Sequence, residues 1–439
     1  MEDNYTLGSI CTSGGVYEQG LPKSIKPIWG VEFDHLVADV YRLNYPDSRI
    51  YVQDACTVNW QELEKPDFLH ASPSCRSYSL ANNKKETEKD IAVAQAIARA
   101  IATFKPKVFT LENVIKYSDS TSWLEVIKPK LESLGYKISA KVEKMHFWGI
   151  PQKRRYRFIA IATLDYGSIM LMPTNRTNYW YELIADLISE LKPSQLTDTQ
   201  IDHLPKKAAR AIADKETVLL KRNQIRNYTG CAYQSEPYCW SPTAKLATDQ
   251  SQNNRPFADL VTPNGIFSLT IRCLARIQTI SDSYILPESN AIAGLVVGDG
   301  VPPLFVSQMW EQILAVLNKK TLLEQNVESN SNALLNNTES SAICGRFEQL
   351  EKVIKKCSGH DVSFYALAKA LQEIKTEKLY QDAGYRSFFR YCSDRHNLQK
   401  TYVSDLLKAV PIYESVKDIT SDLTESHCRE LGKIEDESK

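Results

Sequence analysis

The sequence of 439 residues contains no uninterrupted apolar run near the roughly 20 residues that a membrane-spanning helix needs. Its first residues are acidic and then polar, without the basic start and apolar stretch of a signal peptide. The ten cysteines include no Cys-x-x-Cys pair, which argues against a zinc ribbon and against a disulfide framework. These absences predict a cytoplasmic protein that has no membrane segment and no metal site.

The sequence also lacks an excess of either charge, because 53 Lys and Arg residues balance 53 Asp and Glu residues. The positive charge is nevertheless concentrated locally, in one cluster at residues 205–226 and a second at residues 153–157. Localised basic residues suffice for phosphate contact, so a balanced net charge does not exclude nucleic acid as a partner. The first cluster could equally be the solvated face of a helix.

The pattern of apolar residues divides the chain into segments of different character. Residues 5–165 alternate short apolar runs with stretches of helical periodicity, which is typical of an α/β fold with a parallel sheet. The expected strands are 28–33, 68–71, 108–112 and 158–161, and the expected helices are 89–103, 123–134, 266–280 and 306–316. Residues 173–259 are polar and turn-rich, residues 326–341 resemble a flexible linker, and residues 343–417 are helical in pattern.

Small residues near the N-terminus form a candidate ligand-binding loop. The backbone N–H groups of Ser13, Gly14 and Gly15 follow an apolar run and precede a helix-like segment, so they could approach a ligand. Carboxylates follow the next two expected strands, at Glu32 and Asp54, where nucleotide-binding α/β proteins bind ribose hydroxyls. This order suits a ligand that contains adenosine, although ordinary polar residues at strand ends would look the same.

A candidate nucleophile, Cys75, lies in a small, polar loop with a proline, directly after the strand expected at 68–71. This is the edge of the sheet at which α/β active sites lie. A cysteine in such a loop is more reactive than one in a core, although a lone cysteine is usually structural.

Four further motifs follow the cysteine loop along the chain. They are Glu112-Asn-Val, Pro151-Gln-Lys-Arg154, Leu269-Thr-Ile-Arg272 and Gly298-Asp-Gly-Val-Pro-Pro303. Their order and spacing resemble the DNA cytosine-5 methyltransferases of bacteria and phages, over about residues 5–318. The Asp/Asn-Pro-Pro-aromatic loop of the amino-methyltransferases is absent from the sequence, which disfavours that class.

The resemblance implies a Rossmann-like sheet domain that depends on S-adenosyl-L-methionine, with a small target-recognition region and a C-terminal all-α domain. The expected segments are a catalytic and cofactor-binding core at 1–168, the target-recognition region at 169–265, a return to the core at 266–325, a linker at 326–342 and a helical domain at 343–439.

The chemistry that the resemblance implies is methyl transfer to carbon 5 of a flipped-out cytosine in DNA. Cys75 would attack ring carbon 6, Glu112 would act as an acid at ring nitrogen 3, and Arg154 would stabilise charge at the carbonyl oxygen. The expected cofactor-binding residues are Ser13, Gly14, Gly15, Glu32, Asp54 and Asp299, and the expected DNA contacts in this part are Ser79, Gln152, Arg155 and Arg157.

Several positions depart from the pattern of this family and put rate and cofactor affinity in question. Thr12 stands where a glycine is usual, Ser74 where a proline is usual, Arg76 where a glutamine is usual, Cys273 where a glutamate is usual and Asp299 where an asparagine is usual. Tyr156 stands where a second arginine of the Arg-x-Arg motif is expected if Arg154 is the first.

The pattern of residues 387–410 predicts two helices joined by a turn, and it resembles the helix-turn-helix modules of plasmid and phage regulators. Lys400 and Tyr402 would then face a DNA groove. A helical bundle that binds a protein is the alternative.

Double-stranded DNA is therefore the expected partner, a cognate restriction endonuclease is a candidate partner, and a monomer is expected. Two other functions stay open at this point. One is a cytosine-5 methyltransferase that acts on tRNA. The other is a DNA-binding regulator built on a methyltransferase that has lost its activity.

Overall fold

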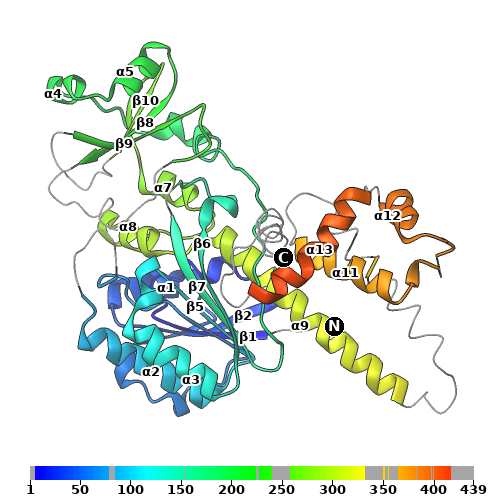
Figure 1. Cartoon of the computed structure of the whole chain (residues 1–439). Coiled ribbons are helices and arrows are strands. Elements are labelled where there is room, and N and C mark those ends of the chain that lie inside the picture. Colours follow the sequence, from blue (N-terminus) through cyan, green and yellow to red (C-terminus); the bar gives the residue numbers. More distant parts are fainter. Residues whose placement is uncertain are drawn as a thin grey trace. The chain divides into compact units, whose positions relative to one another are not determined.

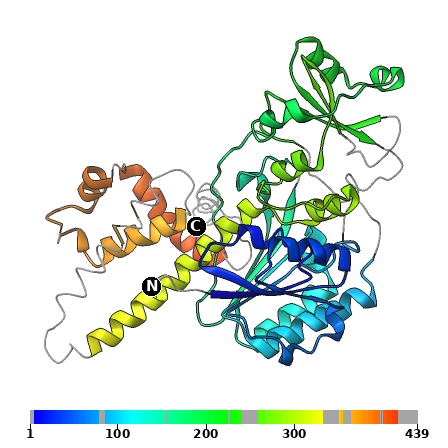
Figure 2. The same ribbon diagram turned by 180° about the vertical axis from the view of Figure 1, so that it is seen from behind.

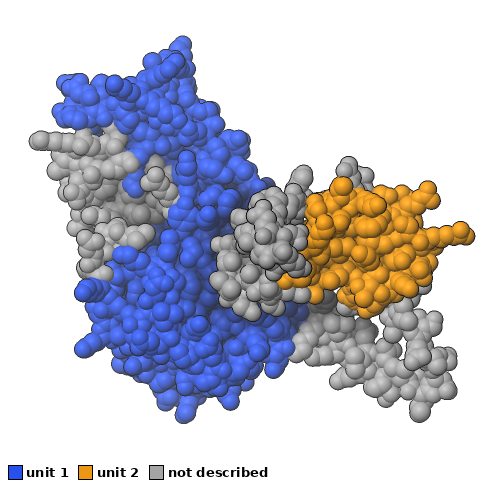
Figure 3. Space-filling model, in the orientation of Figure 1, with its two compact units in different colours: residues 1–325 blue, residues 326–439 orange. Residues whose placement is uncertain are grey.

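A computed structural model describes residues 5–78, 85–153, 155–223, 227–239 and 258–331, and in the C-terminal part 350–351, 354, 364–381, 383–396, 398 and 400–416. The chain forms two compact units, residues 1–325 and residues 326–439 (Figure 3).

A seven-stranded sheet forms the centre of the first unit (Figures 1 and 2). Its order is β3-β2-β1-β4-β5-β7-β6; the pairs among the first five strands are parallel, and β7 is antiparallel to both of its neighbours. The strands are β1 Tyr5–Ile10, β2 Ile25–Glu32, β3 Arg49–Val52, β4 Phe68–Ala71, β5 Val108–Asn113, β6 Lys137–Lys144 and β7 Tyr156–Thr163. The α/β fold predicted from the sequence is confirmed.

Helices cover both faces of this sheet because its central strands direct apolar side chains to both faces. On one face Leu69 and Phe109 pack in the same cluster as Ile97 of α2, and on the other Phe68 stacks on Trp310 of α9. The helices of this layer are α1 His35–Asn44, α2 Glu88–Phe104, α3 Lys128–Ser133, α8 Asn290–Asp299 and α9 Pro303–Ser331. Short 3₁₀ turns lie at Glu18–Gly20, Ala55–Thr57, Trp60–Glu62, Ile115–Asp119, Met145–Phe147 and Ala185–Glu190, and a π-helical turn at Ser122–Ile127.

A second, four-stranded antiparallel sheet lies in the part of the first unit that was expected to be turn-rich (Figure 1). Its order is β11-β10-β8-β9, with α4 Asp198–Asp202 and α5 Lys206–Ala213 preceding it and α7 Ile271–Ile277 following it. The strands are β8 Val218–Asn223, β9 Asn227–Tyr233, β10 Ala258–Thr262 and β11 Gly265–Ser268. α5 buries Ala208 and Ala211 against this sheet, which leaves the basic residues of the helix toward solvent.

The stretch Asn290–Asn318 is, by length and composition, the one described segment that could cross a membrane. It consists of the end-to-end helices α8 and α9, and 67% of its most apolar window is buried inside the protein, as in the core of a globular fold. α9 continues to Ser331, so the predicted linker at 326–342 begins inside a helix; residues 332–342 lie outside the described part of the chain.

The described residues of the second unit are mainly helical. Its elements are α11 Phe364–Thr376, a 3₁₀ turn Leu379–Gln381, α12 Phe388–His396 and α13 Lys400–Val416. Leu371, Tyr391 and Leu406 lie in its apolar core. Glu351 is buried beside this core, where it accepts hydrogen bonds from Tyr391 Oη at 3.0 Å and Arg395 Nη2 at 2.6 Å.

Candidate active site

The carboxyl ends of the parallel strands meet at one edge of the large sheet, and a cavity of about 480 Å³ lies there. The sequence-predicted residues that line it are Ser13, Glu32, Asp54, Cys75, Glu112, Arg157 and Asp299. They come from seven separate segments of the chain, so the fold brings together positions that lie up to 286 residues apart, from Ser13 to Asp299.

The loop after β1 has an unusual backbone. Cys11 and Ser13 adopt positive φ angles of 57° and 53°, a region that favours glycine, and Gly15 follows at 82°. The conformation turns the Ser13 N–H toward Glu32 Oε2, 2.9 Å away. Thr12, at the position of a usual glycine, donates from Oγ1 to Glu18 Oε1 at 2.6 Å, so its hydroxyl is satisfied inside the protein.

Gly14 and Gly15 do not line the cavity within the described residues. A Cβ on Gly14 would stand 2.7 Å from Val296 Cγ1, and one on Gly15 would stand 2.4 Å from Tyr45 Cε2. Both glycines are therefore required for close packing under the loop.

Two carboxylates at one end of the cavity are fixed by backbone donors. Glu32 accepts hydrogen bonds from the backbone N–H groups of Ser13, Phe33 and Asp34, each at 2.9 Å. Burial raises the pKa of Glu32 despite these bonds. Asp54 accepts from the N–H of Cys56 at 3.0 Å, and this bond lowers the pKa of the Asp54 carboxyl.

Two hydrogen bonds hold the start of the cysteine loop. The Ser72 N–H donates to the Ile10 carbonyl at 3.1 Å, and Asn113 Nδ2 donates to the Pro73 carbonyl at 2.8 Å. Cys75 is half-buried. Burial raises the pKa of its thiol, and the nearby Arg157 guanidinium opposes that effect.

Glu112 ends β5 on the other side of the cysteine loop and is 3% exposed. It accepts a hydrogen bond from Ser72 Oγ at 3.0 Å and forms an ion pair with Arg157. The thiol, the carboxylate and the guanidinium thus line one end of the cavity.

Comparison with known proteins identifies the family of the chain. A sequence profile of the family described as C-5 cytosine-specific DNA methylase matches residues 7–315. The chain belongs to this family. It is therefore a DNA methylase that transfers a methyl group to carbon 5 of cytosine, and the methyltransferase activity predicted from the sequence is confirmed.

Individual relatives of this methylase are distant. The Type II methyltransferase M1.HphI of Haemophilus parahaemolyticus is 24% identical over 337 residues, which are 70% of this chain and 86% of that protein. The Type II methyltransferase M.PspPI of a Psychrobacter species is 26% identical over 341 residues, 72% of this chain and 80% of that protein. In fold, the chain is similar to the Entamoeba histolytica methyltransferase EhMeth, with a TM-score of 0.52 and 13% identity over 72% of this chain and 99% of that one.

Two of the three arginines predicted for the site are described in the structure. Arg154 and Ser79 lie outside the described residues. Arg157, expected to bind DNA, is instead 7% exposed and paired with Glu112. Arg155 is 6% exposed and donates from Nη2 to the Gly300 carbonyl at 2.6 Å. Burial, together with the neighbouring Arg157, lowers the pKa of Arg155 to about 9.

Gln152 was also expected to contact DNA, but its side chain is fully buried. Its Nε2 donates to the Ile277 carbonyl at 3.1 Å and to Gln278 Oε1 at 2.7 Å. Gln278 in turn donates to the Gly300 carbonyl at 2.6 Å. Gln152 therefore joins the arginine loop to the end of α7 and cannot reach a DNA phosphate in this structure.

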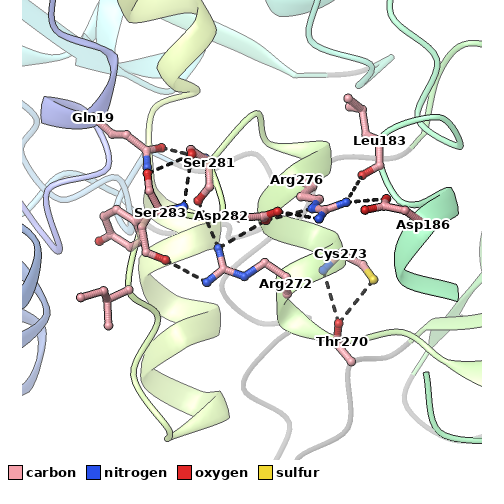
Figure 4. Close-up of polar contacts among 12 residues, drawn as sticks. Gln19, Leu183, Asp186, Thr270, Arg272, Cys273, Arg276, Ser281, Asp282 and Ser283 are labelled. Carbon is pink, nitrogen blue, oxygen red and sulfur yellow. Dashed lines mark hydrogen bonds and ion pairs between the residues drawn. The ribbon is translucent and has the colours of Figure 1, made fainter. Parts of the chain in front are cut away.

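The helix α7 follows the four-stranded sheet, and polar contacts anchor it to neighbouring loops (Figure 4). Arg276 forms ion pairs with Asp186 and Asp282, and Arg272 donates to the Ser281 and Tyr284 carbonyls. Figure 4 also shows Cys273, which stands where a glutamate is usual. Its N–H donates to Oγ1 of Thr270, the N-cap residue of α7, and Thr270 Oγ1 donates to Cys273 Sγ. The helix is therefore capped although the glutamate is missing.

Proposed function

We propose that this methylase takes the methyl group from S-adenosyl-L-methionine and that Cys75, Glu112 and Arg157 carry the reaction at cytosine. The observation that supports the proposal most directly is the convergence of these three side chains on the cavity that Glu32 and Asp54 also line. Arg157 replaces Arg154 in this proposal, because Arg157 is the arginine paired with Glu112.

The residues present fit S-adenosyl-L-methionine. Glu32 and Asp54 stand at the ends of adjacent strands and offer carboxylate oxygens to ribose hydroxyls, while Ser13 and Asp299 line the same cavity. When bound, the sulfonium group supplies an activated methyl group.

At cytosine, the Cys75 thiolate forms a bond to ring carbon 6, and the ring electrons move toward carbon 5 and nitrogen 3. In this proposal Glu112 supplies or holds a proton at nitrogen 3, and Arg157 offsets negative charge on the ring. After methylation a water molecule acting as a base takes the proton from carbon 5, the electrons of that C–H bond re-form the carbon 5–carbon 6 double bond, and the Cys75 thiolate leaves carbon 6. The cytosine must leave the duplex for Cys75 to reach it.

The DNA substrate is proposed to be double-stranded and to be read by the region around the four-stranded sheet, within the segment 169–265. Relatives named as Type II methyltransferases support a role in a restriction-modification system with a cognate endonuclease. We propose that the methylase acts in the cytoplasm as a monomer.

The second unit is proposed to add a further DNA contact. Lys400 and Tyr402 are exposed at the start of α13. The ammonium groups of Lys400 and of Lys375, on α11, lie 5.4 Å and 6.0 Å from the Phe389 ring, so two cations from different helices approach one point on the unit's surface. Cations that gather at one place on a surface are the groups that contact DNA phosphates.

The experiment is to replace Cys75 with serine. Bisulfite sequencing of DNA from cells that express the wild type should reveal methylated cytosines, and DNA from cells with Cys75→Ser should show none, because a hydroxyl is too weak a nucleophile. Cys56→Ser, also near the cavity, is the matched control and should retain methylation. Methylation by Cys75→Ser at the wild-type level would assign the nucleophile elsewhere.

A further inference from the structure

A chain of hydrogen bonds ends on the floor of the catalytic cavity. Trp310 Nε1 donates to Tyr17 Oη at 2.7 Å, Tyr17 Oη lies 3.1 Å from Thr110 Oγ1, and Thr110 Oγ1 lies 2.9 Å from His70 Nδ1. The His70 ring is also stacked on Tyr17, with 3.5 Å between centroids and 9° between planes. The position and rotation of the imidazole are therefore fixed from two sides.

The other ring nitrogen of His70 has no hydrogen-bond partner among the described residues. His70 is 1% exposed and lines the cavity together with Tyr17. A buried nitrogen without a partner is costly and uncommon in proteins. The reaction proposed at cytosine does not use this nitrogen, and its residue lines the cavity, so it is available to a ligand that binds there.

The strand order limits which part of a ligand can reach His70. β4, which carries His70, lies between β1 and β5 in the sheet. On one side of β4, Glu32 is the last residue of β2 and Asp54 follows β3. On the other side, Glu112 lies near the end of β5. His70 therefore lies between the end proposed for adenosine and the end proposed for cytosine, one layer below Ser72 and Glu112.

We propose that His70 Nε2 binds the amino-acid end of S-adenosyl-L-methionine and so positions its sulfonium group. This inference rests on the proposed function. The sulfonium carries three substituents. The methyl group must face the cytosine at Cys75, and the adenosyl group extends to Glu32 and Asp54. The third substituent, which ends in the amino acid, then lies on the floor of the cavity between these two ends.

The chemistry of that arm matches His70. Burial lowers the pKa of His70 to about 3, so the ring is neutral and Nε2 carries either one proton or one lone pair. The amino-acid end has a carboxylate that accepts and an ammonium group that donates. Either tautomer of His70 therefore finds a hydrogen-bond partner on the amino-acid end of the cofactor. An apolar side chain at this position would offer no partner to the carboxylate or to the ammonium group.

The test compares two nucleosides that differ in this arm alone. S-adenosylhomocysteine has the amino-acid end, and 5′-methylthioadenosine carries a methyl group in its place. Binding of each to the full-length protein is measured by titration calorimetry. His70→Phe keeps an aromatic ring against Tyr17 but removes Nε2, so it should weaken binding of S-adenosylhomocysteine about tenfold and leave that of 5′-methylthioadenosine unchanged.

Thr110→Val is the second variant, and it serves if His70→Phe does not fold. It removes the hydroxyl that orients Nδ1 and should weaken S-adenosylhomocysteine about threefold, again without an effect on 5′-methylthioadenosine. Equal losses for both nucleosides, or no loss for either, would overturn the assignment of His70. A wild-type protein that binds neither nucleoside would overturn the proposed function and this inference with it.

Discussion

The ionisation of Cys75 depends on groups that act in opposite directions. Burial raises the pKa of the thiol, the Arg157 guanidinium lowers it, and the Asp299 and Glu112 carboxyl groups raise it. A positive charge favours the thiolate over the neutral thiol, so its removal must raise the pKa of Cys75 further. At neutral pH the fraction of thiolate then falls.

Arg157→Gln should therefore move the pH dependence of Cys75 alkylation to higher pH, and lower methyl transfer by about two orders of magnitude because charge on the ring is no longer offset. Alkylation by iodoacetamide is followed by mass spectrometry of the peptide that contains Cys75. Arg42→Gln, an exposed arginine paired with Asp39, is the control. An unchanged alkylation profile in Arg157→Gln would contradict the proposed electrostatic role.

The sequence predicted most residues that line the cavity, but it did not settle the register of the arginines. Arg154, Arg155 and Arg157 all follow Lys153 and offer several alignments to an Arg-x-Arg motif. Distant partners distinguish the two arginines that the structure describes: Arg155 donates to the Gly300 carbonyl, and Arg157 pairs with Glu112. Gln152 could not be placed, because its partners at 277 and 278 are more than a hundred residues away in the sequence.

At the scale of elements, the strands before the cavity loops were predictable, whereas β6 and the strands of the second sheet were not. β4 and β5 are buried on both faces and read as apolar runs. β6, at the edge, is exposed at most positions, its three lysines among them, and the strands of the second sheet are short. Their stability comes from pairing and packing with distant residues rather than from a local pattern.

The buried carboxylate of Glu351 gives the second unit a dependence on pH. Burial raises the pKa of Glu351, but hydrogen bonds from Arg395 and Tyr391 outweigh it and hold the pKa below its ordinary value of 4.5. A group whose pKa is lower in the folded state stabilises that state above the unfolded pKa, and this stability disappears as the pH falls through the folded pKa.

Glu351→Gln should destabilise the unit by about 2 kcal/mol at pH 7, because it removes a charged acceptor of several hydrogen bonds, and should abolish the added acid sensitivity. Hydrogen exchange of the α12 amides, measured by mass spectrometry between pH 7 and pH 4, reports the opening of this unit. Glu377→Gln, an exposed carboxylate in the same unit, should leave exchange unchanged. Identical exchange in both variants would show that the Glu351 contacts contribute nothing.

At the scale of the whole molecule, we expect the first unit to carry out methyl transfer and the second unit to add affinity for DNA. The catalytic cavity and every residue proposed for methyl transfer lie within residues 1–325. Lys375, Lys400 and Tyr402 lie in the second unit, on residues that the methylase profile, which ends at 315, does not include.

Truncation after Ser331, the last residue of α9, should leave a folded enzyme that methylates short oligonucleotides at the wild-type rate. It should bind long duplex DNA more weakly and with a shallower dependence on salt, because the slope of log affinity against log salt falls by about 0.9 for every DNA phosphate that the protein no longer neutralises. Filter binding over a salt series measures both quantities. The matched control is the full chain with Lys375→Gln and Lys400→Gln, whose slope should fall by about 2 while the helical unit stays intact. Unchanged affinity and slope in both proteins would assign the second unit to a protein partner, and an insoluble truncation would show that residues beyond Ser331 complete the catalytic unit.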